Sequence, residues 1–522
     1  MKHIQRSSVI RTLFFFVLYQ VVFVGISYFL LKRVGAFGCF DDCFNFGAGD
    51  FILQGKQLYS QIFFNHQPFM AYISAAIQYI TEPTTLFELV KYHRIAALVF
   101  ANICGSFLIV RFGLPMVISL IVFESTKFYL FGDRFLAEGF IVYPMMYLMM
   151  LIGQALLKKR IYFWEYMLAA VCSWFIFWMR EPFMPWAPIV LVILFVLGYK
   201  EKESKKYIGI GTGIFLLLHV LTILFLPMRE YIFNVITMNV EQEVGVQLWN
   251  IQTVLQIGFY PVFVIAKGLG TIFQNVLLVL SVIFCGLVAS ELLWKKRFRL
   301  VGVVLVILAL ANIRVVPVGA MYYDAFHLIP WYGIFILSIG LLINDIEKQK
   351  IKNSYKVIVG ISVVWIAAIT FFSPHSYINE TVDTQVEFTT GYGSYFVKGE
   401  VIKMLAQTGD TMFVEMWEDP IYFVAGVPTA YRYSWYTSIM PKFTLYQEAR
   451  NEMFANYPPT FYVGACRGGD IMSFALSGVD AKNYVQLLNS GKPSCVYIQK
   501  TVTSRITKEI SDRMSAYGYS LP

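Results

Sequence analysis

Apolar runs of about 20 residues recur along this chain, and they constrain its fold more than any other feature. A helix of that length crosses the hydrocarbon core of a bilayer. About eleven such runs are present, and they cover 9–31, 95–112, 114–131, 139–157, 161–179, 184–199, 207–227, 273–293, 300–315, 327–344 and 357–372. The sequence therefore predicts a polytopic α-helical membrane protein with about eleven transmembrane helices.

The composition supports the same class of protein. Of the 522 residues, 57% are hydrophobic and 14% are charged, whereas about 25% of the residues of a soluble globular protein are charged. A soluble fold could not bury so much apolar surface in its cores. The same numbers exclude a disordered chain and a disulfide-rich scaffold.

Basic residues lie on alternate sides of the apolar runs, and one side carries most of them. They are Lys2, Arg6, Arg11, Arg111, Lys158, Lys159, Arg160, Lys200, Lys202, Lys205, Lys206, Lys295, Lys296, Arg297, Arg299, Lys348, Lys350, Lys352 and Lys356. The positive-inside rule predicts that this side, and with it the N-terminus, is cytoplasmic. The net charge of +9 is then explained by short cytoplasmic anchors. No nucleic-acid partner is expected, because no contiguous basic face with interleaved aromatic residues occurs.

After Ser373 the hydrophobic runs shorten to the length of strands. Residues 373–522 hold 12 Lys+Arg and 14 Asp+Glu, and a segment of this length can fold by itself. The stretches 411–416, 460–464 and 495–498 predict short buried strands with helices between them. An odd number of spans places this segment outside the cytoplasm. We therefore expect a transmembrane domain over 1–372 and a small extracytoplasmic α/β domain over 373–522.

Four of the seven cysteines fall in predicted outer segments, where disulfides are permitted. Cys466 and Cys495 are one candidate pair. Cys39 and Cys43 are another, provided that a suitable local turn joins them. Both pairings stay open, and no His/Cys spacing matches a zinc site.

The first outer loop, over 32–94, concentrates the polar residues that point to chemistry. Asp41 and Asp42 are adjacent carboxylates beside a membrane, where acids are costly unless they face water, a partner or a substrate. His66 belongs to a polar turn, and residues 69–80 are apolar but too short to span, which predicts an interfacial helix. The plainer alternative is that the Asp pair is a helix cap or a solvated loop.

This loop resembles that of the GT-C superfamily of membrane glycosyltransferases, especially the branch of protein O-mannosyltransferases and aminoarabinose transferases. The resemblance rests on Asp41-Asp42, on residues 52–59 (ILQGKQLY) and on residues 66–68 (HQP). This chain has Asp42 where the family has Glu, and Asn45 where an aromatic residue is usual. Both departures bear on which subfamily and which substrate the resemblance implies.

Weaker similarity extends over most of the chain. It includes Arg94 at the start of the second predicted span, the outer turn with Asp133, Arg134 and Glu138, and Arg314 with residues 322–327. In the tail it covers 409–414, 420–426, 431–433 and 458–463. The order of these motifs carries the resemblance more than any one of them.

The resemblance implies an inverting glycosyltransferase that moves a sugar from a polyprenyl-phosphate donor to an acceptor hydroxyl, on the outer face of the plasma membrane. Asp41 would be the general base, and Asp42 would orient the acceptor or pair with a base. The anionic leaving phosphate needs positive charge and donors. The substrate-binding candidates are Arg94, Arg134, Glu138, Arg314, His327, His66 and Tyr59. For the arginines the plainer role is snorkelling at helix ends, and for His327 it is packing.

The acceptor class stays open between protein, glycolipid and polysaccharide. No obligatory cofactor or metal is expected, although a divalent cation is possible. A membrane transporter or lipid flippase is the main alternative, because intramembrane charges also suit that class. A non-catalytic scaffold that presents the outer domain is a third reading.

Overall fold

The protein is described here from a computed structural model, in which the chain divides into two compact units. The helical unit comprises Met1–Arg33, Arg94–Leu226 and Thr237–Val382, and the sheet unit comprises Val34–His93, Pro227–Ile236 and Asp383–Pro522. The structure describes residues 2–522 except 37, 40, 200–203, 240–270, 294–295, 313–324, 348–364, 367, 369–372, 374–376, 380–381, 416–418, 435, 438–439, 468–469 and 472–480.

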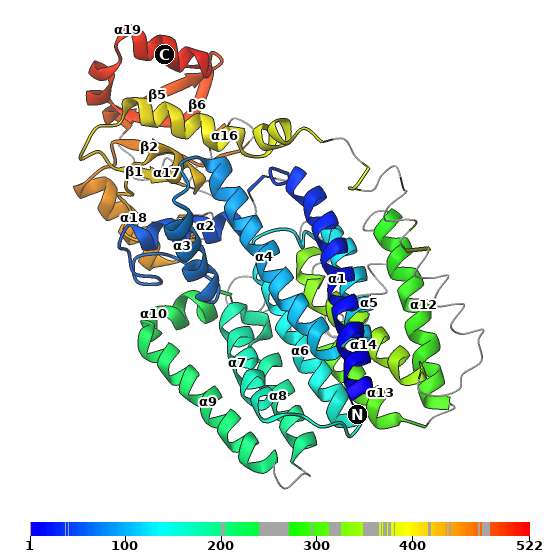
Figure 1. The fold of residues 1–522 in the computed structure, drawn as a ribbon. Helices are drawn as coiled ribbons and strands as arrows, with labels where there is room; N and C mark the ends of the chain where they lie inside the picture. Colours follow the sequence, from blue (N-terminus) through cyan, green and yellow to red (C-terminus); the bar gives the residue numbers. More distant parts are fainter. Residues whose placement is uncertain are drawn as a thin grey trace. The chain divides into compact units, whose positions relative to one another are not determined.

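Long helices build the helical unit (Figure 1). They are α1 (Lys2–Lys32), α4 (Leu86–Phe112, from Arg94 on), α5 (Leu114–Thr126), α6 (Ala137–Leu156), α7 (Phe163–Met179), α8 (Trp186–Gly198), α9 (Ser204–Phe225), α12 (Thr271–Leu293), α13 (Phe298–Ala311) and α14 (Ile329–Glu347). Six described segments are long and apolar enough to cross a membrane, namely Val9–Lys32, Leu86–Phe112, Ala137–Leu156, Glu181–Gly198, Ser204–Phe225 and Ile272–Leu293. They indicate a multi-pass membrane protein.

The other five predicted spans differ from these six. Those at 161–179, 300–315 and 327–344 contain the shorter apolar helices Phe163–Met179, Phe298–Ala311 and Phe326–Leu342. The run at 114–131 stops being α-helical at Thr126, where a 3₁₀ turn follows and Phe131 adopts a left-handed backbone with φ 58°. The run at 357–372 lies largely outside the described residues.

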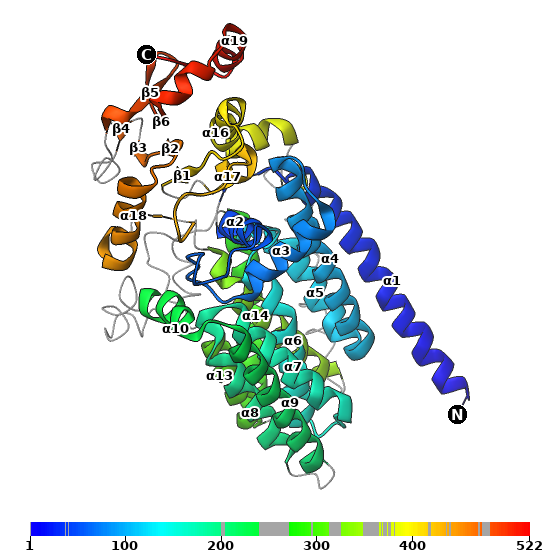
Figure 2. The ribbon, with the colours of Figure 1, turned by 90° about the vertical axis from the view of Figure 1, so that its left-hand side faces the viewer.

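Helix α6 forms the centre of the helical unit, with nearly all of its side chains buried. It packs against α7, α8 and α14 (Figure 2). The α6–α14 contact depends on Gly333, since a Cβ atom there would clash with Val142 and Met146. Small residues are the usual means of close helix packing in membranes, because apolar burial does not drive association in lipid.

A five-stranded mixed sheet and four helices form most of the sheet unit. Its strand order is β1-β2-β6-β5-β7, and only β1 and β2 are parallel. The strands are β1 (Met412–Val414), β2 (Phe461–Val463), β5 (Tyr484–Asn489), β6 (Lys492–Gln499) and β7 (Tyr519–Ser520), beside a separate pair of β3 (Cys466–Arg467) and β4 (Asp470–Ile471). The helices are α16 (Thr384–Leu405), α17 (Pro420–Ala425), α18 (Thr444–Asn456) and α19 (Lys508–Ala516). The small C-terminal α/β region is thus confirmed, with its three predicted strands as β1, β2 and β6.

The predicted outer loop folds within this same sheet unit. It forms α2 (Asp41–Leu53) and α3 (Phe69–Thr81), which pack closely on each other, and α10 (Met228–Tyr231) joins them. The backbone N–H of Phe63 donates to the Tyr433 carbonyl at 2.9 Å, and the ring of Phe51 meets that of Tyr422 at 5.3 Å. Val34–His93 and Asp383–Pro522 thus share one compact unit, a division that differs from the predicted one at residue 372.

Candidate functional site

The Asp pair opens helix α2, and a disulfide between Cys39 and Cys43 brackets it. Asp42 is fully buried, and its Oδ1 accepts a hydrogen bond from the Cys43 backbone N–H at 3.1 Å. Asp41 is half-buried. The first turn of a helix favours negative charge, because its N–H groups have no partner within the helix. One carboxylate of the pair is therefore held inside the fold, and the other keeps access to its surroundings.

Buried polar contacts hold α2 against its neighbours. Nδ1 of His93 lies 2.7 Å from the Leu89 carbonyl, and its Nε2 lies 2.8 Å from the Ser74 hydroxyl. Since a carbonyl only accepts, Nδ1 carries the proton and Nε2 accepts from Ser74. Gln78 donates to the Phe46 carbonyl at 2.9 Å. Sequence reasoning missed His93, because a single histidine in an apolar helix gives no distinctive signal.

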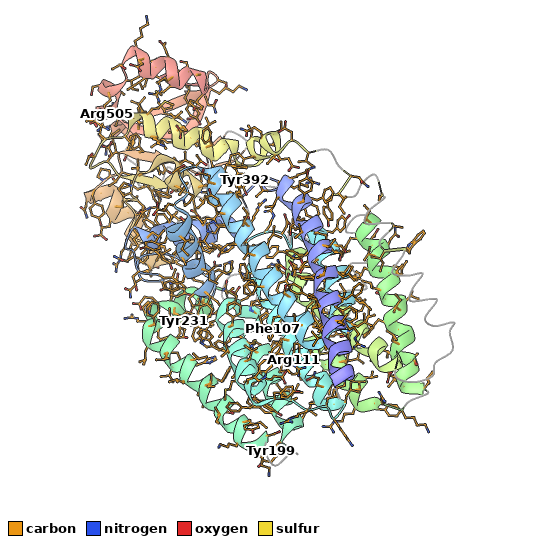
Figure 3. The ribbon with its side chains drawn as sticks, viewed as in Figure 1. Phe107, Arg111, Tyr199, Tyr231, Tyr392 and Arg505 are labelled. Atoms are coloured by element: carbon orange, nitrogen blue, oxygen red, sulfur yellow. A yellow bond between two sulfur atoms is a disulfide. The ribbon has the colours of Figure 1, made fainter. Side chains whose placement is uncertain are left out.

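Tyr59 and His66 lie in the loop between α2 and α3. The buried hydroxyl of Tyr59 donates to the His66 carbonyl at 2.9 Å, and its ring meets Tyr231 of α10 edge-on at 5.4 Å. His66 is half-buried, with its ring edge-on to Phe44 and Phe64. Tyr231 is the last residue of α10 and is labelled in Figure 3. In this conformation Tyr59 braces the loop, and its ring presents no open face on which a sugar could stack.

A buried polar cluster in the helical unit joins two residues that the sequence singled out. Oε1 of Glu138, in the first turn of α6, accepts from Nε of Arg180 at 2.9 Å. The same oxygen lies 2.7 Å from Nδ1 of His327, so this nitrogen donates, because an ionised carboxylate only accepts. The three side chains come from α6, the end of α7 and a 3₁₀ turn before α14. Arg180 also contacts Glu181, at 3.4 Å.

The structure describes two of the three remaining predicted arginines, and both are buried. Arg134 is buried, with its guanidinium 5.3 Å from the Phe131 ring centroid. Arg94 is also buried, but it does not open its helix as expected, because α4 begins at Leu86. Reciprocal hydrogen bonds between Thr85 and Glu88 cap that earlier start. Arg314 lies outside the described residues.

A second buried network lies deeper in the helical unit. Nζ of Lys127 is 2.6 Å from Oε2 of Glu124 and 3.1 Å from the Tyr143 hydroxyl, which in turn donates to Oε1 of Glu124 at 2.6 Å. All three side chains are buried. Neither Glu124 nor Lys127 was predicted, because both fall inside an apolar run that hides their pairing.

A small pocket in the sheet unit is lined by Asp50 and Asp419, between α2 and α17. Burial raises the pKa of Asp50 to about 6, although a hydrogen bond from Gln54 acts against this shift. Within the described part of the chain, no group of three or more His, Cys, Asp or Glu side chains is placed to hold a metal ion.

Comparisons with known protein families and with curated proteins find no match to this chain.

Proposed function

We propose that this protein is an integral membrane glycosyltransferase. It transfers a sugar from a polyprenyl-phosphate donor to an acceptor hydroxyl, with inversion. In this proposal the N-terminus is cytoplasmic, and the Asp pair and the C-terminal sheet lie on the outer face of the plasma membrane. The proposal draws on the resemblance of the first outer loop to the GT-C superfamily.

The observation that carries the proposal is the unequal burial of the Asp pair. A general base must reach the acceptor proton, so it needs an accessible carboxylate with a fixed position. Asp41 is half-buried in the first turn of α2, while Asp42 is fully buried beside it. The Cys39–Cys43 disulfide ties the backbone on both sides of the pair. Asp41 is therefore the proposed base, and Asp42 the residue that positions it.

The Glu138 cluster, within the helical unit, offers donors of the kind that a lipid phosphate needs. A lipid phosphate leaves as an anion, and it is stabilised by charged N–H donors more than by a proton. Arg180 supplies a charged donor and His327 a ring N–H, and Glu138 holds both side chains in place. We assign this cluster to the binding of the phosphate.

A transfer assay with three matched variants tests the proposal. The purified full-length protein would receive polyprenyl-phosphate sugars and candidate acceptors, with Asp41→Asn, Asp42→Asn and Asp50→Asn beside wild type. We expect a loss of 10²-fold or more for Asp41→Asn, in line with the usual contribution of general-base catalysis. Asp50 lies in the same helix but outside the proposed machinery, so its variant should retain activity. Unchanged transfer by both Asp41→Asn and Asp42→Asn would remove the proposed base.

The Glu124–Lys127–Tyr143 network favours a second candidate, a transporter or lipid flippase. Buried ionisable groups in apolar helices commonly mark substrate or proton pathways. A transporter would lose substrate uptake into proteoliposomes in Lys127→Met, with thermal unfolding measured beside it because the variant leaves the buried Glu124 without its cation. A glycosyltransferase would show no vectorial uptake in either form.

A further inference from the structure

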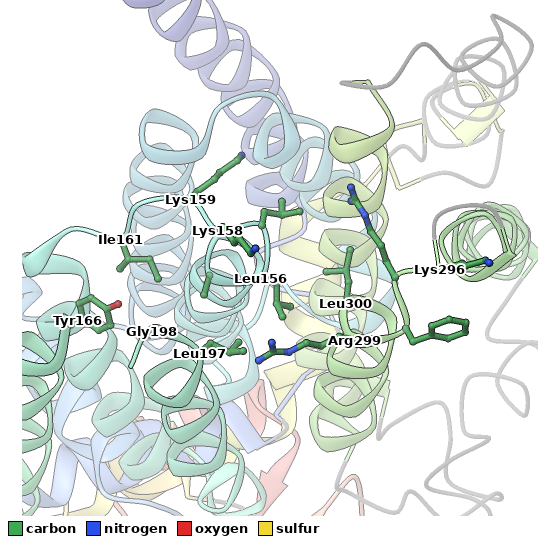
Figure 4. A pocket seen from close by; sticks show the side chains of 14 residues that line it. Leu156, Lys158, Lys159, Ile161, Tyr166, Leu197, Gly198, Lys296, Arg299 and Leu300 are labelled. Carbon is green, nitrogen blue, oxygen red and sulfur yellow. The ribbon is translucent and has the colours of Figure 1, made fainter. Parts of the chain in front are cut away.

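A basic pocket lies at the end of the helical unit where α6 finishes (Figure 4). Its volume is about 630 Å³, which is within the usual range for small-molecule sites. The walls come from the end of α6 and the loop after it, from α7, from the end of α8 and from the start of α13. All of these segments belong to the helical unit, so every wall of the pocket comes from one compact unit.

The charged side chains that line this pocket are of one sign. The described residues that line it include five basic ones, Lys158, Lys159, Lys296, Arg297 and Arg299, and no acidic one. Arg297 lies 4.0 Å from the buried Glu291. Lys158, Lys296 and Arg299 form no ion pair with any residue that the structure describes. The pocket therefore has cationic groups available for an anion.

The rest of the lining is mainly hydrocarbon. It includes Leu156, Leu157, Ile161, Leu197, Phe298 and Leu300. Figure 4 shows the Arg299 side chain extending from the start of α13 toward Leu197 at the end of α8. A ligand held here would meet a guanidinium and an apolar wall together, so an amphipathic anion fits better than a wholly polar one.

The depth of the pocket suits a lipid head group. Helix α6 has 20 residues, so it is about 30 Å long, which equals the thickness of the hydrocarbon core. Glu138 marks its first turn, and the basic pocket begins at its last residues. The cations thus lie at one end of a membrane-spanning helix, where lipid phosphates are found.

We propose that this pocket binds an anionic glycerophospholipid. Its phosphate contacts Lys158 and Arg299, and the first part of an acyl chain lies on the leucine wall. Basic pockets between transmembrane helices are known binding sites for anionic lipid head groups. A soluble phosphate would leave the apolar wall unused, and a zwitterionic lipid would bring its own cation toward Lys158 and Arg299. This inference does not depend on the proposed function.

Native mass spectrometry of the delipidated full-length protein tests the site, with added phosphatidylglycerol or phosphatidylcholine as probe. We expect phosphatidylglycerol to bind more tightly, and the double variant Lys158→Gln/Arg299→Gln to bind it roughly tenfold to thirtyfold more weakly. The matched control is Arg160→Gln/Lys206→Gln, which removes two exposed cations outside the pocket. This control should bind like wild type.

A variant that fills the apolar part of the pocket tests the shape of the site separately from its charge. Leu197→Trp keeps all five cations but occupies the apolar part of the site, so it should also reject the lipid. Melting temperatures without lipid would establish that each variant is folded. Equal binding of the two lipids, or wild-type affinity in Lys158→Gln/Arg299→Gln, would overturn the proposal. Displacement of the lipid by an equal concentration of glycerol 3-phosphate would also overturn it, because the site would then be one for soluble anions.

Discussion

Nδ1 of His327 lies 2.7 Å from Oε1 of Glu138, although 189 residues separate the two along the chain. Both side chains are buried, and the Glu138 oxygen that accepts from His327 also accepts from Arg180. A buried carboxylate with two donors depends strongly on its partners, because a charge left alone there carries its full desolvation cost.

Glu138→Gln should destabilise the protein by about 3 kcal/mol, because it leaves the buried Arg180 guanidinium with only the longer contact to Glu181, at 3.4 Å. Thermal unfolding in detergent would measure the loss. Arg180→Gln should cost a similar amount. The double variant Glu138→Gln/Arg180→Gln should cost less than the sum of the two, with a coupling of about 1–3 kcal/mol. Strict additivity would contradict the pairing.

Arg450→Met should strongly destabilise the C-terminal sheet. Nε of Arg450 donates to the buried Oε1 of Glu415 at 2.6 Å, and Tyr462 donates to the other oxygen at 2.8 Å. The variant leaves a buried carboxylate without a cation, at an expected cost of about 3–5 kcal/mol. Faster hydrogen exchange in β1 and β2 would report the effect. Lys403→Met is the control, because its contact with Glu400 is exposed and long, at 3.8 Å.

Asp50→Asn should stabilise the protein near neutral pH and lose this effect in acid. Burial raises the folded-state pKa of Asp50 to about 6, above its ordinary value of 3.8. The unfolded carboxyl therefore ionises first as the pH rises, and the penalty on the folded state grows between about pH 4 and pH 6. The difference in melting temperature between Asp50→Asn and wild type should be close to zero at pH 4 and largest above pH 6. A difference that does not change with pH would argue against a buried, titrating carboxyl.

Cysteine labelling should establish the orientation. The Cys39–Cys43 disulfide should react with a membrane-impermeant maleimide only after reduction, and from the outer side of intact cells. Lys159→Cys should be labelled only after the membrane is opened. The background would carry Ala at the free cysteines Cys104, Cys172 and Cys285 and also at Cys466 and Cys495, so that Cys39 and Cys43 alone react after reduction. Labelling of Lys159→Cys from outside would reverse the proposed topology.

Local sequence patterns accounted for much of the fold. Apolar runs identified the six long helices, and the short run at 69–80 matches α3. The strands at 411–416, 460–464 and 495–498 reappear as β1, β2 and β6. These features follow from helix length, side-chain period and apolar content, which are properties of neighbouring residues.

Local sequence patterns predicted neither the exact ends of the helices nor the grouping of segments into compact units. The helix with Arg94 starts eight residues before that position, because Thr85 and Glu88 form a cap that no apolar pattern records. Residues 41–81 belong with the C-terminal sheet, through contacts such as Phe51 with Tyr422. Such contacts join residues more than 300 positions apart, so no local pattern can report them.

The sequence by itself determined that this is a membrane protein of many helices with a small α/β region at its C-terminus, and it singled out the Asp pair, Glu138 and His327. Only the tertiary structure decided that Asp42 is buried while Asp41 is not, that Glu138 holds both Arg180 and His327, and that the basic ends of α6 and α13 share one pocket. Burial and pairing depend on which distant segments come into contact, and composition and periodicity do not show which segments these are.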